Sequence, residues 1–122
     1  MSDDQAPTPD LDHPRVSRGT EPRFEIHVDD SGTPVGFADF VDVTSADGTQ
    51  ERIFPHTEVD EAYGGRGLAS TLVRAALDAT VAEGRKIVAV CSYVKRWVER
   101  HEEYQQHLVD TRPDHLEAVD QG

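Results

Sequence analysis

The chain has 122 residues, which is enough for one domain with a single hydrophobic core. Its net charge of -12 argues against a nucleic-acid partner, because such binding depends largely on Lys and Arg contacts to phosphates. No apolar run approaches the length of a membrane span, and the first residues hold acids and prolines where a signal peptide is basic and apolar. We therefore expect a soluble, cytoplasmic protein without a membrane partner.

Both ends of the chain are expected to lie outside the folded core. Residues 1–22 hold four of the seven prolines and almost no large apolar side chains, a composition typical of disorder. The tail at 109–122 has a similar acidic composition, although Leu116 and Val119 offer weak docking points. This leaves one folded domain at residues 23–108, a workable size for a single core.

The first half of this domain predicts three antiparallel strands. Apolar and polar residues alternate at 23–28 and at 35–43, and a third strand-like segment covers 50–59. Short turn sequences separate the three segments, which indicates a meander. Pro55 lies inside the third segment and cannot donate a ladder hydrogen bond, so we expect a β-bulge that moves the rest of this strand away from a neighbour.

A helix, an inner strand and a closing helix are predicted after the meander. Apolar residues recur every three or four positions from Leu68 to Val81, and Gly84 stands where a C-cap glycine is expected. The apolar run KIVAVC at 86–91 is typical of an inner parallel strand reached by a right-handed crossover. The closing helix is expected to bury one face, formed by Val94, Trp97, Val98, His101 and Tyr104 or Gln105. The predicted fold class is α/β (α+β): a mixed sheet with a three-strand antiparallel meander, one parallel strand added through a crossover helix, and a closing helix.

A glycine cluster, YGGRGLAS at 63–70, opens the predicted crossover helix. Gly64, Gly65 and Gly67 allow a tight turn and a close approach by a ligand. The first N–H groups of a helix are unpaired and its dipole favours an anion, so a phosphate is the expected ligand. A single glycine would indicate a simple turn, whereas three glycines around Arg66 favour the anion site. The residues of a P-loop and the spacing of a dinucleotide-binding loop are both absent from the sequence.

The stretch VDEAYGGRGLASTLVRAAL resembles the turn that binds the acyl-CoA pyrophosphate in the GNAT superfamily of N-acyltransferases, whose pattern is Gln/Arg-x-x-Gly-x-Gly/Ala. Gly64, Gly67 and Ala69 take the first, fourth and sixth positions, with glycine at the first where the family usually has Gln or Arg. The segments PHTEV, GGRGLAS, CSYV and HEEY are similar, in order and spacing, to a short GNAT subfamily. Its members have a truncated N-terminal half and a cysteine after the strand that follows the helix. The resemblance covers about residues 25–108 and implies acetyl-CoA as the acyl donor.

The resemblance also implies where the acyl donor binds. The glycine turn would hold the pyrophosphate through backbone N–H groups. The pantetheine arm would enter between the bulged strand and the next parallel strand and pair with the backbone like an extra strand. Backbone N–H groups around residues 57–59 would polarise the thioester carbonyl. The cofactor-binding residues expected on this basis are Thr57, Val59, Gly64, Gly65, Arg66, Gly67, Leu68, Ala69 and Ser70.

Three side chains are the candidate catalytic groups. Cys91, the single cysteine, excludes an internal disulfide and follows the strand that would line the gap. It either packs as an inert thiol, or takes the acyl group, or protonates the departing CoA thiolate. His56 and Glu58 share one face of a strand, where they form either a polar surface or the base that deprotonates an amine. A metal site is not expected, because this pair supplies at most two ligands.

The leading hypothesis is an acyl-CoA-dependent N-acyltransferase that transfers acetyl from acetyl-CoA to a primary amine of a protein, peptide or small molecule. The alternative is a non-catalytic CoA-binding or interaction module with the same fold. GNAT enzymes often use a tyrosine acid and an asparagine, whereas this chain has no asparagine and no tyrosine that the sequence assigns to that role. A nucleotide binder that uses the same turn is a third, weaker option.

Overall fold

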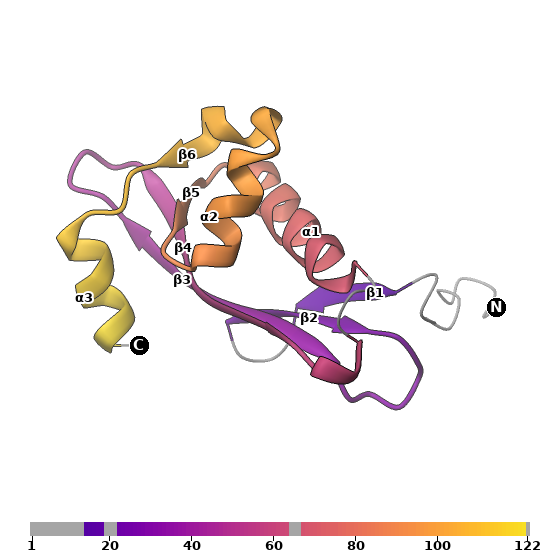
Figure 1. Ribbon diagram of the computed structural model, residues 1–122. Helices are drawn as coiled ribbons and strands as arrows, with labels where there is room; N and C mark the ends of the chain where they lie inside the picture. Colours follow the sequence, from indigo (N-terminus) through magenta and orange to yellow (C-terminus); the bar gives the residue numbers. More distant parts are fainter. Residues whose placement is uncertain (1–13, 19–21, 64–66, 122) are drawn as a thin grey trace, which may run out of the picture.

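The computed structural model describes residues 14–18, 22–63 and 67–121, which form a six-stranded sheet with helices on both faces (Figure 1). The strand order is β1-β2-β3-β4-β5-β6; β1 to β4 are antiparallel to one another, and β5 and β6 continue the sheet from β4 in parallel. In chain order the elements are β1 (Arg15–Arg18), β2 (Arg23–His27), β3 (Gly36–Thr44), β4 (Gln50–Val59), the 3-10 helix η2 (Glu61–Tyr63), α1 (Leu68–Ala82), β5 (Lys86–Ala89), α2 (Ser92–Glu99), the 3-10 helix η3 (Glu102–His107), β6 (Leu108–Val109) and α3 (Pro113–Gln121).

The predicted meander, crossover helix and parallel strand are confirmed as β2–β3–β4, α1 and β5. Gly84 has a φ of 77°, and its N–H donates to the carbonyl of Val81, as expected just after a helix. The closing helix is shorter than expected. It ends at Glu99, and His101 then adopts φ -131° and ψ 86°, which stops the helix before η3 begins. Tyr104 is nevertheless buried, as the apolar stripe predicted.

Regular structure also lies beyond residues 23–108, near both ends of the chain. β1 belongs to the segment expected to be disordered. It pairs with β2 through backbone hydrogen bonds, and Arg18 forms an ion pair of 3.0 Å with Glu83. These contacts need few apolar side chains, so composition did not reveal them. In the C-terminal tail, β6 pairs with β5, and α3 buries His115 completely against the sheet.

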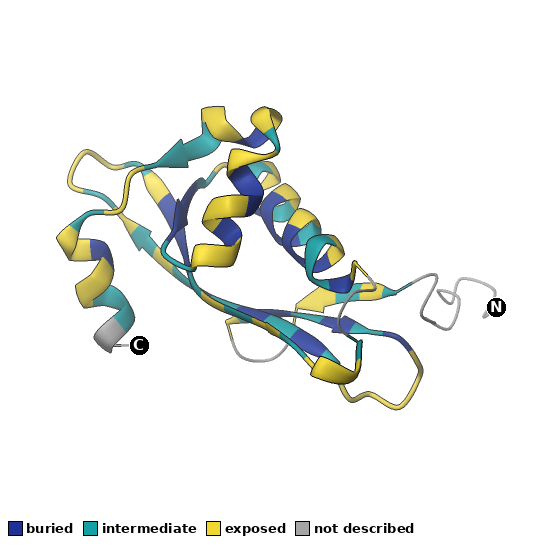
Figure 2. Ribbon diagram, in the orientation of Figure 1, coloured by how far each residue is buried: buried dark blue, intermediate teal, exposed yellow. Residues whose placement is uncertain are grey.

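The sheet separates two layers of helices. β5 and β6 are added to the same side of β4, so two right-handed crossovers place α1 and α2 on one face. α3 lies on the other side of β3 and β4 (Figure 1). Figure 2 shows the buried residues concentrated where the strands meet α1 and α2. None of the helices in the described part of the chain combines the length and apolar composition needed to span a bilayer.

The bulge expected at Pro55 is confirmed. Asp39 of β3 pairs with His56, whereas Val41 pairs with Ile53, so two residues of β4 stand opposite one residue of β3. The two bulge residues of β4 are Phe54 and Pro55. The parallel ladder with β5 runs from Glu51–Lys86 to Phe54–Ala89. Among the described strands, the rest of β4 is paired with β3 alone, which leaves its other edge open toward the end of β5.

The bulge also resets which side chains face α1. Before it, Arg52 and Phe54 point toward α1, and Glu51 points toward α3. After it, the partly buried residues are Thr57 and Val59, and Val59 packs against the α1-side core. An uninterrupted alternation from Phe54 would instead place His56 on that side. The bulge therefore turns the expected catalytic pair, His56 and Glu58, toward solvent on the opposite face.

Candidate active site

The described part of the glycine turn begins at Gly67, the N-cap of α1, because Gly64, Gly65 and Arg66 lie outside the described residues. Gly67 has a φ of 75°, a left-handed conformation that favours glycine. Thr71 donates to its carbonyl from both the backbone N–H and the hydroxyl, each at 3.1 Å. By helix geometry, the N–H groups of residues 68–70 have no acceptor within α1. Gly67 is exposed, and a Cβ on it would meet no described atom within 4 Å.

The side chains at the start of α1 serve packing. Leu68 is buried in the core, and Ala69 is half-buried. Ser70 accepts a hydrogen bond of 2.9 Å from the indole Nε1 of Trp97, which ties α1 to α2. Leu68, Ala69 and Ser70 therefore have backbone N–H groups, rather than free side-chain charges, to offer to an anion.

The open edge of β4 meets this turn at the same end of the sheet, because α1 starts there after η2. Thr57 and Val59, both expected to contact the acyl donor, lie on this part of β4. The hydroxyl of Thr57 is buried and has no hydrogen-bond partner in the described part of the chain. An open strand edge, an exposed helix N-terminus and an unsatisfied hydroxyl fit an extended acyl-CoA, which combines amides with a pyrophosphate.

Cys91 stands at the junction of β5 and α2. It is the N-cap of α2 in an extended conformation, and its carbonyl accepts from the N–H of Lys95 at 3.0 Å. Its own N–H donates to the carbonyl of Phe54, the first bulge residue, at 2.8 Å. The thiol side chain is half-buried and packs against the α1-side core. The structure therefore brings Cys91 to the point where β4 and β5 separate.

His56 and Glu58 occupy the opposite face of β4. Their side chains are 56% and 62% exposed, and His56 Nε2 lies 3.1 Å from Glu58 Oε1. The ring of Phe37 stands beside the imidazole, with ring centroids 5.8 Å apart. The structure thus pairs His56 with Glu58, but it places Cys91 on the other side of the sheet from this pair.

A hollow of about 530 Å³ adjoins the His56–Glu58 pair at the end of β4. Its lining combines apolar residues with the carboxylates of Glu58, Asp60 and Glu61. It is lined by Pro34, Val35, Gly36, Phe37, Glu58, Val59, Asp60 and Glu61. A Cβ on Gly36 would come within 2.8 Å of the carbonyl of Glu58, so glycine is required for β3 to approach β4 here.

Tyr104 is a buried tyrosine of η3 that bonds to side chains of α1. Tyr104 is buried beside α1 and donates from its hydroxyl to Asp78 at 2.5 Å. Burial and the bond to Asp78 raise the pKa of this phenol, so it keeps its proton. Arg74 lies 3.4 Å from the same hydroxyl. Tyr104 is therefore a structural group that joins α1 to η3, and its place on the apolar stripe was the signal in the sequence.

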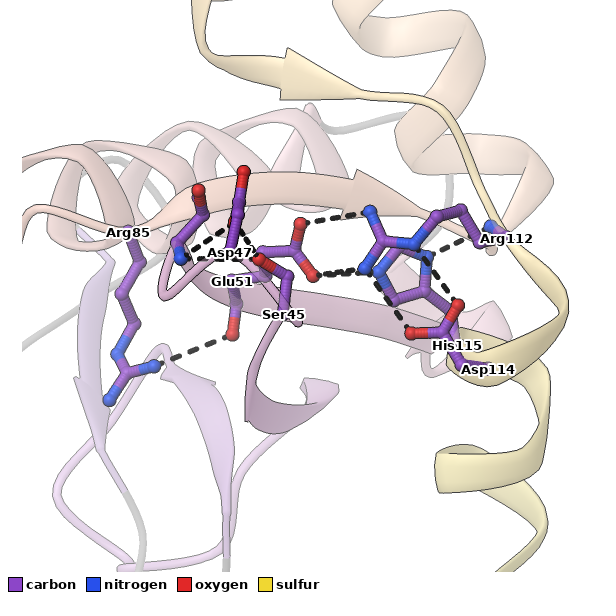
Figure 3. A network of polar contacts seen from close by, with 8 residues as sticks. Ser45, Asp47, Glu51, Arg85, Arg112, Asp114 and His115 are labelled. Atoms are coloured by element: carbon purple, nitrogen blue, oxygen red, sulfur yellow. Dashed lines mark hydrogen bonds and ion pairs between the residues drawn. The ribbon is translucent and has the colours of Figure 1, made fainter.

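A buried charge cluster fixes α3 to β4 just before the bulge (Figure 3). Arg112 donates from Nη1 and Nη2 to the two carboxylate oxygens of Glu51, at 3.1 and 2.8 Å. The backbone N–H of Arg112 donates to Nδ1 of His115, so the imidazole proton is on Nε2, which lies 2.8 Å from Glu51 Oε1 and donates to it. Burial raises the pKa of Glu51, but the bonds from Arg112 and His115 outweigh it and the net pKa is lowered.

No local pattern in the sequence predicts this cluster. Glu51 lies 61 positions before Arg112 and 64 positions before His115. One local signal was present, because Pro113 followed by Asp114 is typical of the first turn of a helix. That signal predicts α3 but not the side of the sheet on which it packs.

Comparison with known proteins agrees with this geometry. A family model described as GCN5-related N-acetyl-transferase matches residues 23–108. Protein NATD1 of Gallus gallus is 44% identical over 55 residues, which cover 43% of this chain and 50% of that protein. Protein NATD1 of Homo sapiens is 46% identical over 46 residues, or 38% and 41% of the two chains. These matches thus span half or less of the length of either relative.

The fold has a close counterpart among solved structures. The solution structure of a GCN5-like protein from Staphylococcus aureus superimposes with a TM-score of 0.59 at 25% identity, over 81% of this chain and 91% of that one. The family match covers all elements from β2 to η3, and the mixed sheet with its bulged β4 is the same in kind as the fold predicted from the motifs. The chain belongs to the GCN5-related N-acetyltransferase (GNAT) family.

Proposed function

We propose that the chain is an acetyltransferase that moves an acetyl group from acetyl-CoA to a primary amine of a protein, peptide or small molecule. The observation that carries this proposal is the separation of β4 from β5 after Phe54, at the end of the sheet where α1 begins. An open strand edge can pair with an extended amide-containing arm, and a helix N-terminus can bind a pyrophosphate. Acetyl-CoA has both parts.

Each part of the acyl donor has a proposed partner. Backbone N–H groups at 64–70 bind the pyrophosphate, and Arg66 adds a side-chain cation. The backbone of Thr57 and Val59 pairs with the pantetheine arm and polarises the thioester carbonyl. Because backbone groups bind the phosphates, the net charge of -12 does not oppose binding.

The proposed reaction is an acyl substitution in which one C–N bond forms and one C–S bond breaks. The amine nitrogen attacks the thioester carbonyl carbon, and its proton passes to His56 or Glu58, directly or through water. The CoA thiolate leaves and takes a proton from the Cys91 thiol, and solvent returns the proton held by His56 or Glu58 to the Cys91 thiolate. In the variant route, the Cys91 thiolate first takes the acetyl group, and the amine then attacks the acylated cysteine.

The hollow beside Glu58 is the proposed entry for the acceptor. Its three carboxylates, Glu58, Asp60 and Glu61, favour a positively charged acceptor in the encounter step. The amine then loses a proton near His56 before it attacks. An open hollow of this kind suits an amine on a long side chain or a small polyamine.

The test is a calorimetric titration of the purified chain with acetyl-CoA, followed by an acceptor screen that measures thiol release. The expected result is saturable binding at micromolar concentration and turnover with at least one amine. Absence of binding at high micromolar acetyl-CoA would refute the proposal.

The alternative, a CoA-binding module without transfer, has one observation in its favour. Cys91 packs on the α1 side of the sheet, whereas His56 and Glu58 project from the other face. Binding of acetyl-CoA without turnover for any amine would favour this module. Competition between CoA and ATP would test the nucleotide-binder option.

A further inference from the structure

The buried hydroxyl of Thr57 has no hydrogen-bond partner among the residues that the structure describes. Within the described residues, two buried side-chain polar atoms have no hydrogen-bond partner: Thr57 Oγ1 and Arg52 Nη1. The unpaired Nη1 of Arg52 belongs to a guanidinium that other contacts already hold. This group binds Asp42 and Glu83 and lies 4.3 Å from the ring of Phe40. No such contacts explain the unpaired hydroxyl of Thr57 in the described structure. Buried hydroxyls in native proteins are usually paired, so an unpaired one needs a reason.

The surroundings of Thr57 explain why no side chain pairs with it. Its side chain lies on the α1 side of β4, past the bulge, where the flanking Val59 packs against the apolar core. Its cross-strand partner on β3 is Ala38, which is buried and has no polar side-chain atom. The other edge of this part of β4, toward the end of β5, is not paired with a described strand. That edge is therefore a route by which a ligand can reach the hydroxyl.

We propose that the Thr57 hydroxyl is a positioning group that hydrogen-bonds to an amide or thioester carbonyl of an arm lying along the open edge of β4. This inference rests on the proposed function, since acetyl-CoA supplies such an arm. A hydroxyl both donates and accepts, so it can bind either a carbonyl oxygen or an amide N–H of an extended chain. A nucleotide without the arm reaches the glycine turn but leaves the hydroxyl unpaired.

The experiment compares Thr57→Val with Thr57→Ser. Valine keeps the shape of threonine and removes the hydroxyl, whereas serine keeps the hydroxyl. Calorimetry with CoA and with adenosine 3′,5′-bisphosphate measures the affinity for a ligand with and without the pantetheine arm. Thermal unfolding gives the melting temperature of the ligand-free protein. Thr44→Val, an exposed position at the far end of β3, is the matched control.

The expected result for Thr57→Val is a weaker affinity for CoA by about tenfold, the effect of one lost hydrogen bond. Its affinity for the bisphosphate should stay within about twofold, and its melting temperature without ligand should equal or exceed that of the wild type. Thr57→Ser should bind CoA within about threefold of the wild type. Thr44→Val should change neither affinity.

Two outcomes overturn the assignment while the proposed function stands. One is an unchanged CoA affinity in Thr57→Val. The other is an equal loss for both ligands with a lower melting temperature, which indicates a hydroxyl paired with a structural water and a role in stability alone. If the wild type binds neither CoA nor the bisphosphate, the proposed function itself fails, and this inference fails with it.

Discussion

The backbone N–H of Cys91 donates a 2.8 Å hydrogen bond to the carbonyl of Phe54. This bond joins the start of α2 to the bulge of β4, directly after the last parallel pair, Phe54–Ala89. The two strands diverge beyond it, so Cys91 borders the proposed thioester site through a fixed backbone contact. The side chain adds packing against the α1-side core. Removing the thiol therefore tests chemistry and packing at once.

Cys91→Ala is expected to lower kcat for acetyl transfer by about tenfold or more, because the thiol supplies the leaving-group proton or accepts the acetyl group. Stability should fall by about 1 kcal/mol, since the half-buried sulfur leaves a small cavity. Steady-state kinetics and thermal unfolding measure the two effects. The affinity for acetyl-CoA should be retained, and mass spectrometry of the wild type mixed with acetyl-CoA reports whether the thiol is acetylated. An unchanged kcat would assign Cys91 to packing alone.

Gly67→Ala is expected to weaken acetyl-CoA binding by about tenfold, because a methyl group at a φ of 75° strains the turn that presents the helix N-terminus. The strain should also cost about 1 kcal/mol of stability. Gly84→Ala is the matched control. Gly84 has a φ of 77° at the other end of α1, and like Gly67 it has no described atom near a Cβ. The control should lose similar stability without losing affinity; an equal loss of affinity in both variants would contradict a binding role for the turn.

His56→Ala is expected to lower kcat by about 100-fold, since the amine then lacks its proton acceptor. Acetyl-CoA affinity should be unaffected, because the imidazole projects from the face of β4 opposite α1 and is 56% exposed. His27→Ala provides the comparison and should keep kcat: His27 lies 3.7 Å from Glu25 in a less exposed His–Glu pair on β2. Glu58→Gln reports whether the carboxylate assists. Wild-type turnover in both His56→Ala and Glu58→Gln would remove the pair from the mechanism.

Glu51→Gln is expected to destabilise the fold by about 2 kcal/mol at pH 7, because it removes the charge of a buried carboxylate that pairs with the 38% exposed side chain of Arg112. Burial raises the pKa of Glu51, but Arg112 and His115 lower it further, and the net shift is downward. A carboxylate with a lowered folded-state pKa stabilises fully above its unfolded pKa of about 4.3, and this stabilisation is lost as the pH falls through the folded value.

The pH dependence separates this ion pair from general packing. Urea unfolding at pH 7 and at pH 3.5 should give a smaller difference in the free energy of unfolding for Glu51→Gln than for the wild type. Glu58→Gln, in an exposed pair, should cost less than about 1 kcal/mol at either pH. Parallel pH profiles of wild type and Glu51→Gln would show that the cluster does not contribute through its charge.

Much of the fold follows from local patterns. The alternation at 23–28, 35–43 and 50–59 and the helical stripe from Leu68 to Val81 predict β2, β3, β4 and α1, because burial of one face imposes a period on the sequence. Pro55 predicts the bulge and Gly84 the end of α1, because each has a backbone property that few other residues share. These effects act within a few residues, so the elements they produce could be predicted from the sequence alone.

Features that depend on contacts between residues distant in the sequence could not be predicted from it. No local rule predicts that Glu51 meets Arg112 and His115, which lie 61 and 64 positions further along the chain, or that β1 joins the sheet. The face on which His56 and Glu58 project depends on the shift in side-chain alternation at the bulge and on where α1 packs. The sequence placed Cys91 beside the bulge only through resemblance; the bond to Phe54 places it there by geometry. Several folds satisfy the local periodicity about equally well, and contacts between distant residues determine which of them forms.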